Sequence, residues 1–217
     1  RGWGSVCFGH DGSVYLCEYL KGDRPYQGGA MRTLPGTNVV GYGRIAQFDA
    51  SMRLVREFAN ETAESLTGFH GVTHSAMHPR DEVVTYLTDL GMRVMRYDVS
   101  ANKQLPDLVT YPGGEAYARK WTTGVAYRRD GTLLLLRGSF IDLLDDRGDS
   151  MRTIPLDAYG YAMITASADD RHVFCTNIFT GVMSKIELES GTIAGQIDTG
   201  FAKPQRSLAG VAEYRAS

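Results

Sequence analysis

The sequence lacks the features that mark several large classes of protein. No run of about 18 apolar residues occurs in it, so no segment is predicted to span a bilayer as a helix. The 23 lysines and arginines nearly balance the 25 aspartates and glutamates, which gives no sign of a nucleic-acid or anionic-membrane partner. No glycine-rich phosphate loop, nucleophile elbow, paired-cysteine zinc pattern or basic stripe is present. The composition, 43% hydrophobic, is ordinary for a soluble globular protein.

Cysteine is scarce, and its number is odd. Cys7, Cys17 and Cys175 each lie in an apolar run, which favours buried free thiols, with a Cys7–Cys17 bridge as the alternative. No signal peptide is visible. Because the sequence begins Arg1-Gly2-Trp3 without methionine, we expect its natural start to have been removed. The sequence leaves both a cytoplasmic and a secreted location open.

A short pattern recurs four times along the chain, and it predicts the fold. The copies are RIAQFD at 44–49, RVMRYD at 93–98, FIDLLD at 140–145 and a weaker MSKIEL at 183–188. They lie roughly 40 to 50 residues apart, the period of one four-stranded propeller blade. An acidic turn such as Asp11-Gly12 or Asp130-Gly131 and an apolar run precede them, which is typical of a hairpin. The sequence therefore predicts an all-β fold, a β-propeller with four visible blades and almost no helix.

The chain is predicted to form a single domain over residues 1–217, divided into four units. The units cover about 4–66, 69–111, 120–156 and 159–199, and a closing strand follows at 208–214. Unit one carries a long insertion from Glu18 to Val40, and such a loop in a compact repeat is usually functional or mobile. Four units and one unmatched strand favour an open arc whose N-terminal blades are missing or come from a second chain. Closure by 208–214 beside the first unit is the alternative.

The second unit carries the residues of a family resemblance: FHGVTHS at 69–75, HPRDE at 78–82, TYLTD at 85–89 and RVMRYD at 93–98. These segments resemble the six-bladed propellers of the gluconolactonase, regucalcin and strictosidine-synthase-like superfamily. The insertion of unit one and the ending GVAEY at 210–214 resemble the same family. The similarity covers nearly the whole chain against the C-terminal four blades of that fold. It implies a small-molecule hydrolase, lactonase or lyase that works in the central channel.

The resemblance also bears on metal binding. Lactonases of this family hold a divalent cation with asparagine, aspartate and glutamate oxygens. His70 stands where the family has asparagine, and Thr123 stands where it has aspartate. Calcium prefers six to eight oxygen ligands, so a calcium site is disfavoured and no cofactor is predicted.

His70 and His74 are the candidate catalytic residues. Residues four apart on a strand share a face, but they are separated by about 13 Å at 3.3 Å per residue, too far for both to bind one ion. Histidine titrates near neutrality, which suits general acid or base catalysis. The alternative is that His70 is a hydrogen-bonded side chain that plugs the channel. His78 is expected to be structural.

The candidate ligand-binding residues are polar side chains that end the second strand of each unit, with nearby aromatic and hydroxyl side chains. They are Glu18, Asp89, Arg137 and Asn177, together with Thr123, Trp3 and Trp121. Equivalent positions in a propeller converge on one face, where Arg137 would bind an anion or carbonyl of a small ligand. Polar strand ends that merely meet solvent, and aromatics that pack between blades, are the alternative. The segment VFCTN at 173–177 also resembles the YVTN repeat of NHL-like surface propellers, so a noncatalytic propeller that binds a peptide, protein or small ligand remains the second hypothesis.

Overall fold

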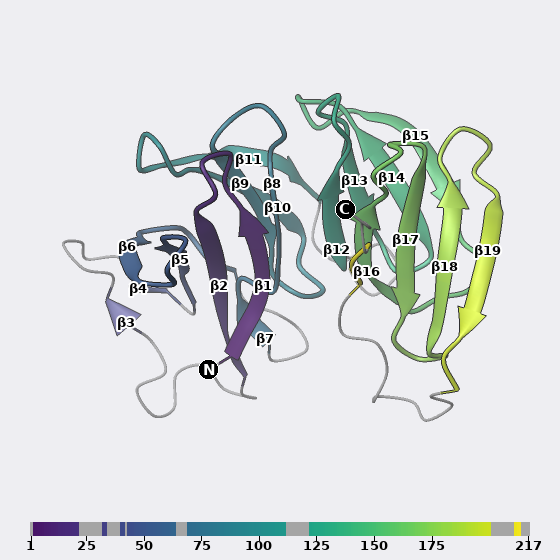
Figure 1. Ribbon diagram of the computed structural model, residues 1–217, viewed down its shortest axis with the longest axis horizontal. Coiled ribbons are helices and arrows are strands. Elements are labelled where there is room, and N and C mark those ends of the chain that lie inside the picture. The colour runs from purple at the N-terminus through teal and green to yellow at the C-terminus, as the bar shows by residue number, and fades with distance from the viewer. Residues whose placement is uncertain are drawn as a thin grey trace. The chain divides into compact units, whose positions relative to one another are not determined.

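A computed structural model describes residues 2–21, 32–33, 40–41, 43–63, 69–111, 122–200 and 211–213 of the chain. All secondary-structure elements in these ranges are strands, so the predicted all-β class is confirmed. These ranges hold no helix that could cross a membrane. The strands fall into two compact units, Arg1–Ala116 and Tyr117–Ser217, which are described one at a time (Figure 1).

The first unit holds two antiparallel sheets of the blade type, blade 1 and blade 2. Blade 1 has the order β1-β2-β5-β6, with β1 (Gly2–Phe8), β2 (Val14–Lys21), β5 (Ile45–Phe48) and β6 (Leu54–Phe58). The short strand β7 (Phe69–Gly71) pairs with the end of β2. Blade 2 has the order β8-β9-β10-β11, with β8 (His74–Met77), β9 (Val83–Leu87), β10 (Arg93–Asp98) and β11 (Lys103–Thr110). In the predicted insertion, β3 (Arg32–Thr33) pairs with β4 (Val40–Gly41), and 22–31 and 34–39 lie outside the described residues.

The second unit repeats this arrangement in blade 3 and blade 4. Blade 3 has the order β12-β13-β14-β15, with β12 (Gly124–Tyr127), β13 (Leu133–Leu136), β14 (Phe140–Leu144) and β15 (Ser150–Pro155). Blade 4 has the order β16-β17-β18-β19, with β16 (Tyr161–Ala166), β17 (His172–Asn177), β18 (Val182–Glu187) and β19 (Ile193–Asp198). The described residues thus contain the four blades that the repeat predicts.

The predicted acidic turns lie directly before the second strand of blades 1 and 3. Asp11 Oδ1 accepts the N–H of Ser13, and Asp130 Oδ1 accepts the N–H of Thr132, each at 2.9 Å. Gly12 and Gly131 follow the two aspartates with φ of +83° and +92°. Glycine enters this left-handed region without the cost that a Cβ imposes, which explains the Asp-Gly pairs.

One main-chain hydrogen bond closes each of these turns and defines equivalent positions in the four blades. The N–H groups of Gly9, His78, Arg128 and Ser167 donate to the carbonyls of Ser13, Val83, Thr132 and His172 at 2.8–3.0 Å. The next residue after each acceptor pairs with the third strand, as Val14 does with Phe48 and Val173 does with Ile186. Phe48 is the fifth residue of the first copy of the sequence pattern, so Ile186 is the fifth residue of the fourth copy. The fourth copy therefore begins at Val182 rather than Met183, one residue earlier than predicted.

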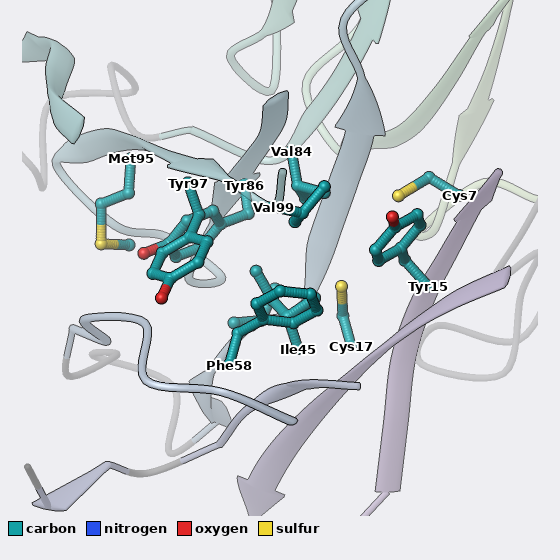
Figure 2. Packing of buried hydrophobic residues seen from close by; sticks show 11 residues of the cluster. Cys7, Tyr15, Cys17, Ile45, Phe58, Val84, Tyr86, Met95, Tyr97 and Val99 are labelled. Atoms are coloured by element: carbon teal, nitrogen blue, oxygen red, sulfur yellow. The ribbon is translucent and has the colours of Figure 1, made fainter. Parts of the chain in front are cut away.

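Each unit is held together by an apolar layer between its two blades. We call the side of blade 1 that faces this layer its back face and the side of blade 2 that faces it its front face, and we use the same names for blades 3 and 4. In the first unit the layer contains Tyr15, Cys17, Ile45 and Phe58 from blade 1 with Val84, Tyr86, Met95 and Tyr97 from blade 2 (Figure 2). In the second unit it contains Leu134, Leu136, Ile141 and Ile154 with Tyr161, Val173, Cys175 and Ile186. The alternation of side chains along each strand produces the two faces.

The three cysteines are free and buried, so the alternative Cys7–Cys17 bridge is not formed. Cys17 Sγ donates a hydrogen bond to Ser75 Oγ at 3.3 Å. Burial raises the pKa of the Cys17 thiol to about 11, and it also raises the pKa values of Cys7 and Cys175. A protonated, buried thiol is a poor nucleophile, so these residues serve packing.

A carboxylate contact between neighbouring turns recurs along the chain. The residue after Gly9, Arg128 or Ser167 donates its N–H to a carboxylate from a later segment. The contacts are His10 to Glu82 at 3.2 Å, Arg129 to Asp170 at 3.0 Å, and Ala168 to Glu213 at 2.6 Å. Glu82 and Asp170 lie in the corresponding turn of the next blade, and Glu213 takes the same role. Of the predicted closing strand 208–214 only 211–213 are described, and these three residues have no strand pairing.

Candidate functional site

The predicted site residues are distributed over both units. Trp3, Glu18, His70, His74 and Asp89 lie in the first unit, and Thr123, Arg137 and Asn177 lie in the second. Trp121 lies outside the described residues. The geometry of each group is therefore given within its own unit.

His70 and His74 lie on different strands, separated by a bend. His70 belongs to β7 and pairs with Leu20 of β2, so it is part of the sheet of blade 1, whereas His74 begins β8 of blade 2. Gly71 makes the bend with φ of +106°, and a Cβ at this position would lie 3.1 Å from the Glu18 carbonyl oxygen. Thr88 Oγ1 donates to the Gly71 carbonyl at 2.5 Å. Both imidazoles are buried, and the bend places them in different sheets.

The hydroxyl of Thr73 is hydrogen-bonded to the imidazole of His74. The hydroxyl oxygen lies 3.3 Å from the Leu87 carbonyl oxygen and 2.9 Å from His74 Nδ1. We assign the hydroxyl proton to the Leu87 carbonyl, which only accepts, and with this assignment the hydroxyl oxygen accepts a proton from Nδ1–H of His74. Nε2 of His74 then carries a lone pair. This atom is buried and has no hydrogen-bond partner among the described residues.

The surroundings of His74 keep it neutral. Burial lowers its pKa below the usual value, and the negative charge of Asp89 opposes this shift only in part. A neutral imidazole with a free lone pair at Nε2 is a base, and a nearby carboxylate would stabilise the imidazolium that forms when it takes a proton. His74 therefore has the chemical form that general base catalysis requires.

Glu18 and Trp3 belong to a different cluster, on the front face of blade 1. Glu18 Oε2 lies 3.1 Å from Arg44 Nε, and Arg44 Nη1 forms an ion pair with Glu57. The Arg44 guanidinium lies 5.6 Å from the Trp3 ring centroid, within the range of a cation–π contact.

The Glu18 cluster and His74 face opposite ways. Ser75 faces blade 1, because its hydroxyl hydrogen-bonds to Ser5 and Cys17. His74, the residue before Ser75 on the strand, therefore points to the back face of blade 2. The structure thus divides the predicted residues of the first unit between two faces.

The predicted ring of strand-two ends needs one correction. The carbonyl that closes each turn belongs to the residue at or just before the start of the second strand, and equivalent positions are found by counting from it. The position five residues later is occupied by Glu18, Thr88, Arg137 and Asn177 in the four blades. Asp89 lies one position later. Thr88 is fully buried, and its hydroxyl donates to the carbonyls of Gly71 and Ala63. A buried hydroxyl thus takes the place that the sequence pattern assigned to a carboxylate.

The predicted residues of the second unit make local hydrogen bonds. Thr123 Oγ1 lies 2.9 Å from the Tyr161 carbonyl oxygen and accepts the N–H of Gly138 at 3.2 Å. Arg137 Nη1 lies 3.3 Å from Asp142 Oδ2, and both side chains are buried. Asn177 Oδ1 accepts the N–H groups of Phe179 and Thr180, and its amide donates to the Tyr159 carbonyl. These contacts hold turns and strand ends in place.

Arg44 and Thr73 were missed from the sequence. The sequence did contain an indication of Arg44. Two copies of the repeated third-strand pattern begin with arginine, and in both blades the next strand contains an acidic residue that could pair with it. Arg93 donates to Asp107 at 2.6 Å in blade 2, as Arg44 pairs with Glu57 in blade 1. Thr73 had no signal, since a threonine before a strand is common and its role depends on where the Leu87 carbonyl lies.

The described residues show no group of three or more histidines, cysteines and carboxylates that could hold a metal ion. A cavity of about 370 Å³ lies in the second unit, between arginines 128, 152 and 171 and acidic residues 170, 187 and 189. It contains none of the predicted site residues.

Comparisons with known proteins establish the fold alone. No family model matches the sequence, and no curated protein matches it. Among solved structures, Kuenenia stuttgartiensis hydrazine synthase is similar with a TM-score of 0.59 and 15% identity, over 90% of this chain and 48% of that chain. A streptogramin B lyase is similar with a TM-score of 0.57 and 12% identity, over 90% of this chain and 54% of that chain. The chain thus spans about half the length of these structures, and their likeness supports a β-propeller fold.

Proposed function

We propose that this chain is part of a propeller enzyme of the hydrolase, lactonase or lyase class, which acts on a small organic molecule with His74 as the general base. With it we propose that the four blades are the C-terminal part of a six-bladed propeller of the gluconolactonase, regucalcin and strictosidine-synthase-like superfamily. The observation that carries the catalytic proposal is the buried Nε2 atom of His74, which has no hydrogen-bond partner among the described residues. Such an atom costs stability unless something else bonds to it, as a substrate or an attacking water would.

The roles of the neighbouring groups follow from this assignment. Nε2 of His74 takes a proton from water or from the substrate, and the hydroxyl of Thr73 holds Nδ1–H so that the lone pair stays on Nε2. Asp89 stabilises the imidazolium until the proton is returned to the leaving group. The scheme calls for no metal. The streptogramin B lyase among the similar structures is consistent with a propeller scaffold that hosts lyase chemistry.

The test compares variants of His74 and Thr73 with a control at His78. Turnover is measured on a panel of lactones, aryl esters and β-elimination substrates. His74→Ala should lower turnover by about 100-fold or more, because a placed acid or base contributes 10²–10⁴. Thr73→Val should lower it less and shift the pH profile, because both tautomers become accessible. His78→Gln, at a turn where Nδ1 bonds to the N–H of Asp81, should leave turnover unchanged.

Two results would count against the catalytic role. If His74→Ala loses stability but retains turnover per folded molecule, His74 is a buried structural residue. If the unsubstituted protein turns over no member of the panel, the noncatalytic alternative gains ground.

A further inference from the structure

The cavity of about 370 Å³ in the second unit is lined by charged side chains from both of its blades. Blade 3 contributes Arg128 and Arg152, and blade 4 contributes Arg171. The rest of the lining consists of three acidic residues and two leucines, Asp170, Glu187, Glu189, Leu143 and Leu188. At about 30 Å³ per molecule the cavity has room for about twelve waters, and so for a small organic ion.

This cavity lies at the end of the blades opposite to the strand-two ends that the repeat singles out. Arg128 belongs to the turn before β13, and Arg171 belongs to the turn before β17. Arg137 follows the last residue of β13, and Asn177 ends β17. The cavity is therefore a separate feature of the second unit, and its role does not depend on His74 in the first unit.

One of the three arginines has a counterpart in the first unit. Arg152 donates to the carbonyl of Leu188, and Arg56 donates to the carbonyl of Val99. The two arginines hold the same register position in the outer strands of blades 3 and 1, and the two carbonyls follow the third strands of blades 4 and 2. Because the contact recurs, we assign Arg152 to the packing between neighbouring blades.

The other two arginines have no such counterpart. Gly9 takes the place of Arg128, since the N–H of each closes the turn between the first two strands of its blade. Glu82 takes the place of Arg171, since the carbonyl of each accepts the N–H of the residue that follows the third strand. The second unit thus carries two positive charges that the blade architecture does not require.

The guanidinium of Arg128 has carboxylate partners but keeps one free donor. Its Nη1 lies 3.1 Å from Asp130 Oδ2, and its Nη2 lies 3.4 Å from Asp170 Oδ2. Its Nε is buried and has no hydrogen-bond partner among the described residues. A buried N–H without an acceptor costs free energy, which a ligand that brings an acceptor would recover.

Two positive and two negative charges of the lining have no ion pair among the described residues. Arg152 donates to main-chain carbonyls, and the carboxylate of Glu187 accepts a hydrogen bond from Ser190. Arg171 and Glu189 are exposed, and their side chains make no hydrogen bond or ion pair within the part of the chain that the structure describes. Charges of both signs are therefore available to a ligand in one cavity.

We infer that this cavity binds a small zwitterion of the amino acid class. The guanidinium of Arg171 donates charge-assisted hydrogen bonds to the carboxylate of the ligand, and the carboxylate of Glu189 accepts hydrogen bonds from its ammonium group. A ligand with both charges matches both signs of the lining, whereas a phosphate would be repelled by the three carboxylates. Leu143 and Leu188 offer contact to an aliphatic side chain of the ligand.

Isothermal titration calorimetry of the full-length polypeptide tests this inference. The probes are the common amino acids, with propionate and propylamine as ligands of one charge and with inorganic phosphate, all at one ionic strength. At least one amino acid should bind with a Kd below about 1 mM, and each single-charge probe should bind at least about 10-fold more weakly, because it lacks one set of charge-assisted hydrogen bonds.

Two variants separate the contributions of the two charges. Arg171→Gln should remove the advantage of the amino acid over propylamine, and Glu189→Gln should remove its advantage over propionate. Both side chains are exposed, so Tm should stay unchanged. Arg147→Gln is the matched control, since Arg147 is an exposed arginine of blade 3 outside the lining, and it should leave the affinity unchanged.

Three outcomes overturn the inference. If no amino acid binds with a Kd below about 1 mM, the charges of the lining only meet solvent. If propionate or phosphate binds as tightly as the best amino acid, the cavity is a site for anions. If Arg171→Gln and Glu189→Gln retain the full affinity, the amino acid binds elsewhere. Should Arg171→Gln lower Tm, Arg171→Lys, which keeps the charge without the planar fork, replaces it in the comparison and should still weaken binding of the carboxylate.

Discussion

Removing Arg137 should destabilise the second unit strongly, because Arg137 compensates a buried charge. Arg137 and Asp142 are each only 6% exposed, and Arg137 Nη1 lies 3.3 Å from Asp142 Oδ2. Thr153 Oγ1 donates to the other oxygen of Asp142 at 2.6 Å. The substitution Arg137→Met keeps most of the aliphatic volume and removes the positive charge. Asp142 would keep its bond from Thr153 but lose the ion pair.

The magnitude follows from the cost of a buried charge without a partner. Removing one member of a buried ion pair typically costs about 3–5 kcal/mol. In a protein of this size one kcal/mol corresponds to roughly 2–4 °C in Tm, so Arg137→Met should lower Tm by roughly 6–20 °C. The double variant Arg137→Met/Asp142→Leu should recover most of this loss, since well-packed apolar residues often replace a buried pair without cost.

Urea and thermal unfolding, followed by circular dichroism, measure these differences. Asp142→Asn is the complementary single variant, because it keeps an acceptor for Thr153 and leaves the charge of Arg137 uncompensated. A free energy of unfolding for Arg137→Met within about 0.5 kcal/mol of the parent, the range of ordinary surface substitutions, would refute the reasoning. In that case the predicted role of Arg137 in ligand binding would be the better account of its presence.

Two further predictions concern protonation and the contacts between turns. Burial lowers the pKa values of His74 and His78 below 6.5, so the unfolded chain binds more protons than the folded chain once the pH falls below about 6.5. The free energy of unfolding should therefore decrease as the pH falls from about 8 to about 5, and His74→Gln should flatten that dependence; a rise would contradict it. Glu213→Ala should speed amide hydrogen exchange at Ala168, measured by NMR, while Arg129, whose N–H bonds to Asp170, serves as the unchanged control. Glu213→Gln, which keeps an acceptor oxygen, should have a smaller effect, and an unchanged rate at Ala168 in Glu213→Ala would show that the contact is not formed in solution.

The fold could be predicted from the sequence because its determinants are local. Asp-Gly turns such as Asp11-Gly12 and alternating apolar residues fix hairpins within a few residues of chain. Strand β7 was not predicted as part of blade 1, since Phe69–Gly71 reads like the start of the next blade. Its pairing depends on a close approach to β2, where a Cβ on Gly43 or Gly71 would meet the Glu18 carbonyl oxygen. In the sequence, the only trace of such a close approach is a glycine. Glycine also occurs in turns and at other positions, so its presence does not predict this pairing.

The site was harder to predict because it depends on registers and distant partners. Asp89 ends the apolar run of blade 2 in the sequence, and so it was grouped with Glu18. The structure shows that the polar position comes one residue earlier, at Thr88, whose hydroxyl is satisfied by the Gly71 carbonyl 17 residues away. A threonine in an apolar run looks like an ordinary strand residue, so its place in the register is visible only when the strands are paired.

The four equivalent strand-end positions have four different roles, and this limits what a repeat can say about function. Glu18 pairs with Arg44, Thr88 donates to the Gly71 carbonyl, Arg137 pairs with Asp142, and Asn177 caps its own turn. The blade geometry holds each side chain at the same place in its sheet, but the partner comes from a different segment each time. A functional residue is therefore better sought where a buried polar atom lacks a partner among the described residues than where a repeat position is polar. His74 meets that criterion through Nε2, and Arg128, which lines the cavity of the second unit, meets it through Nε.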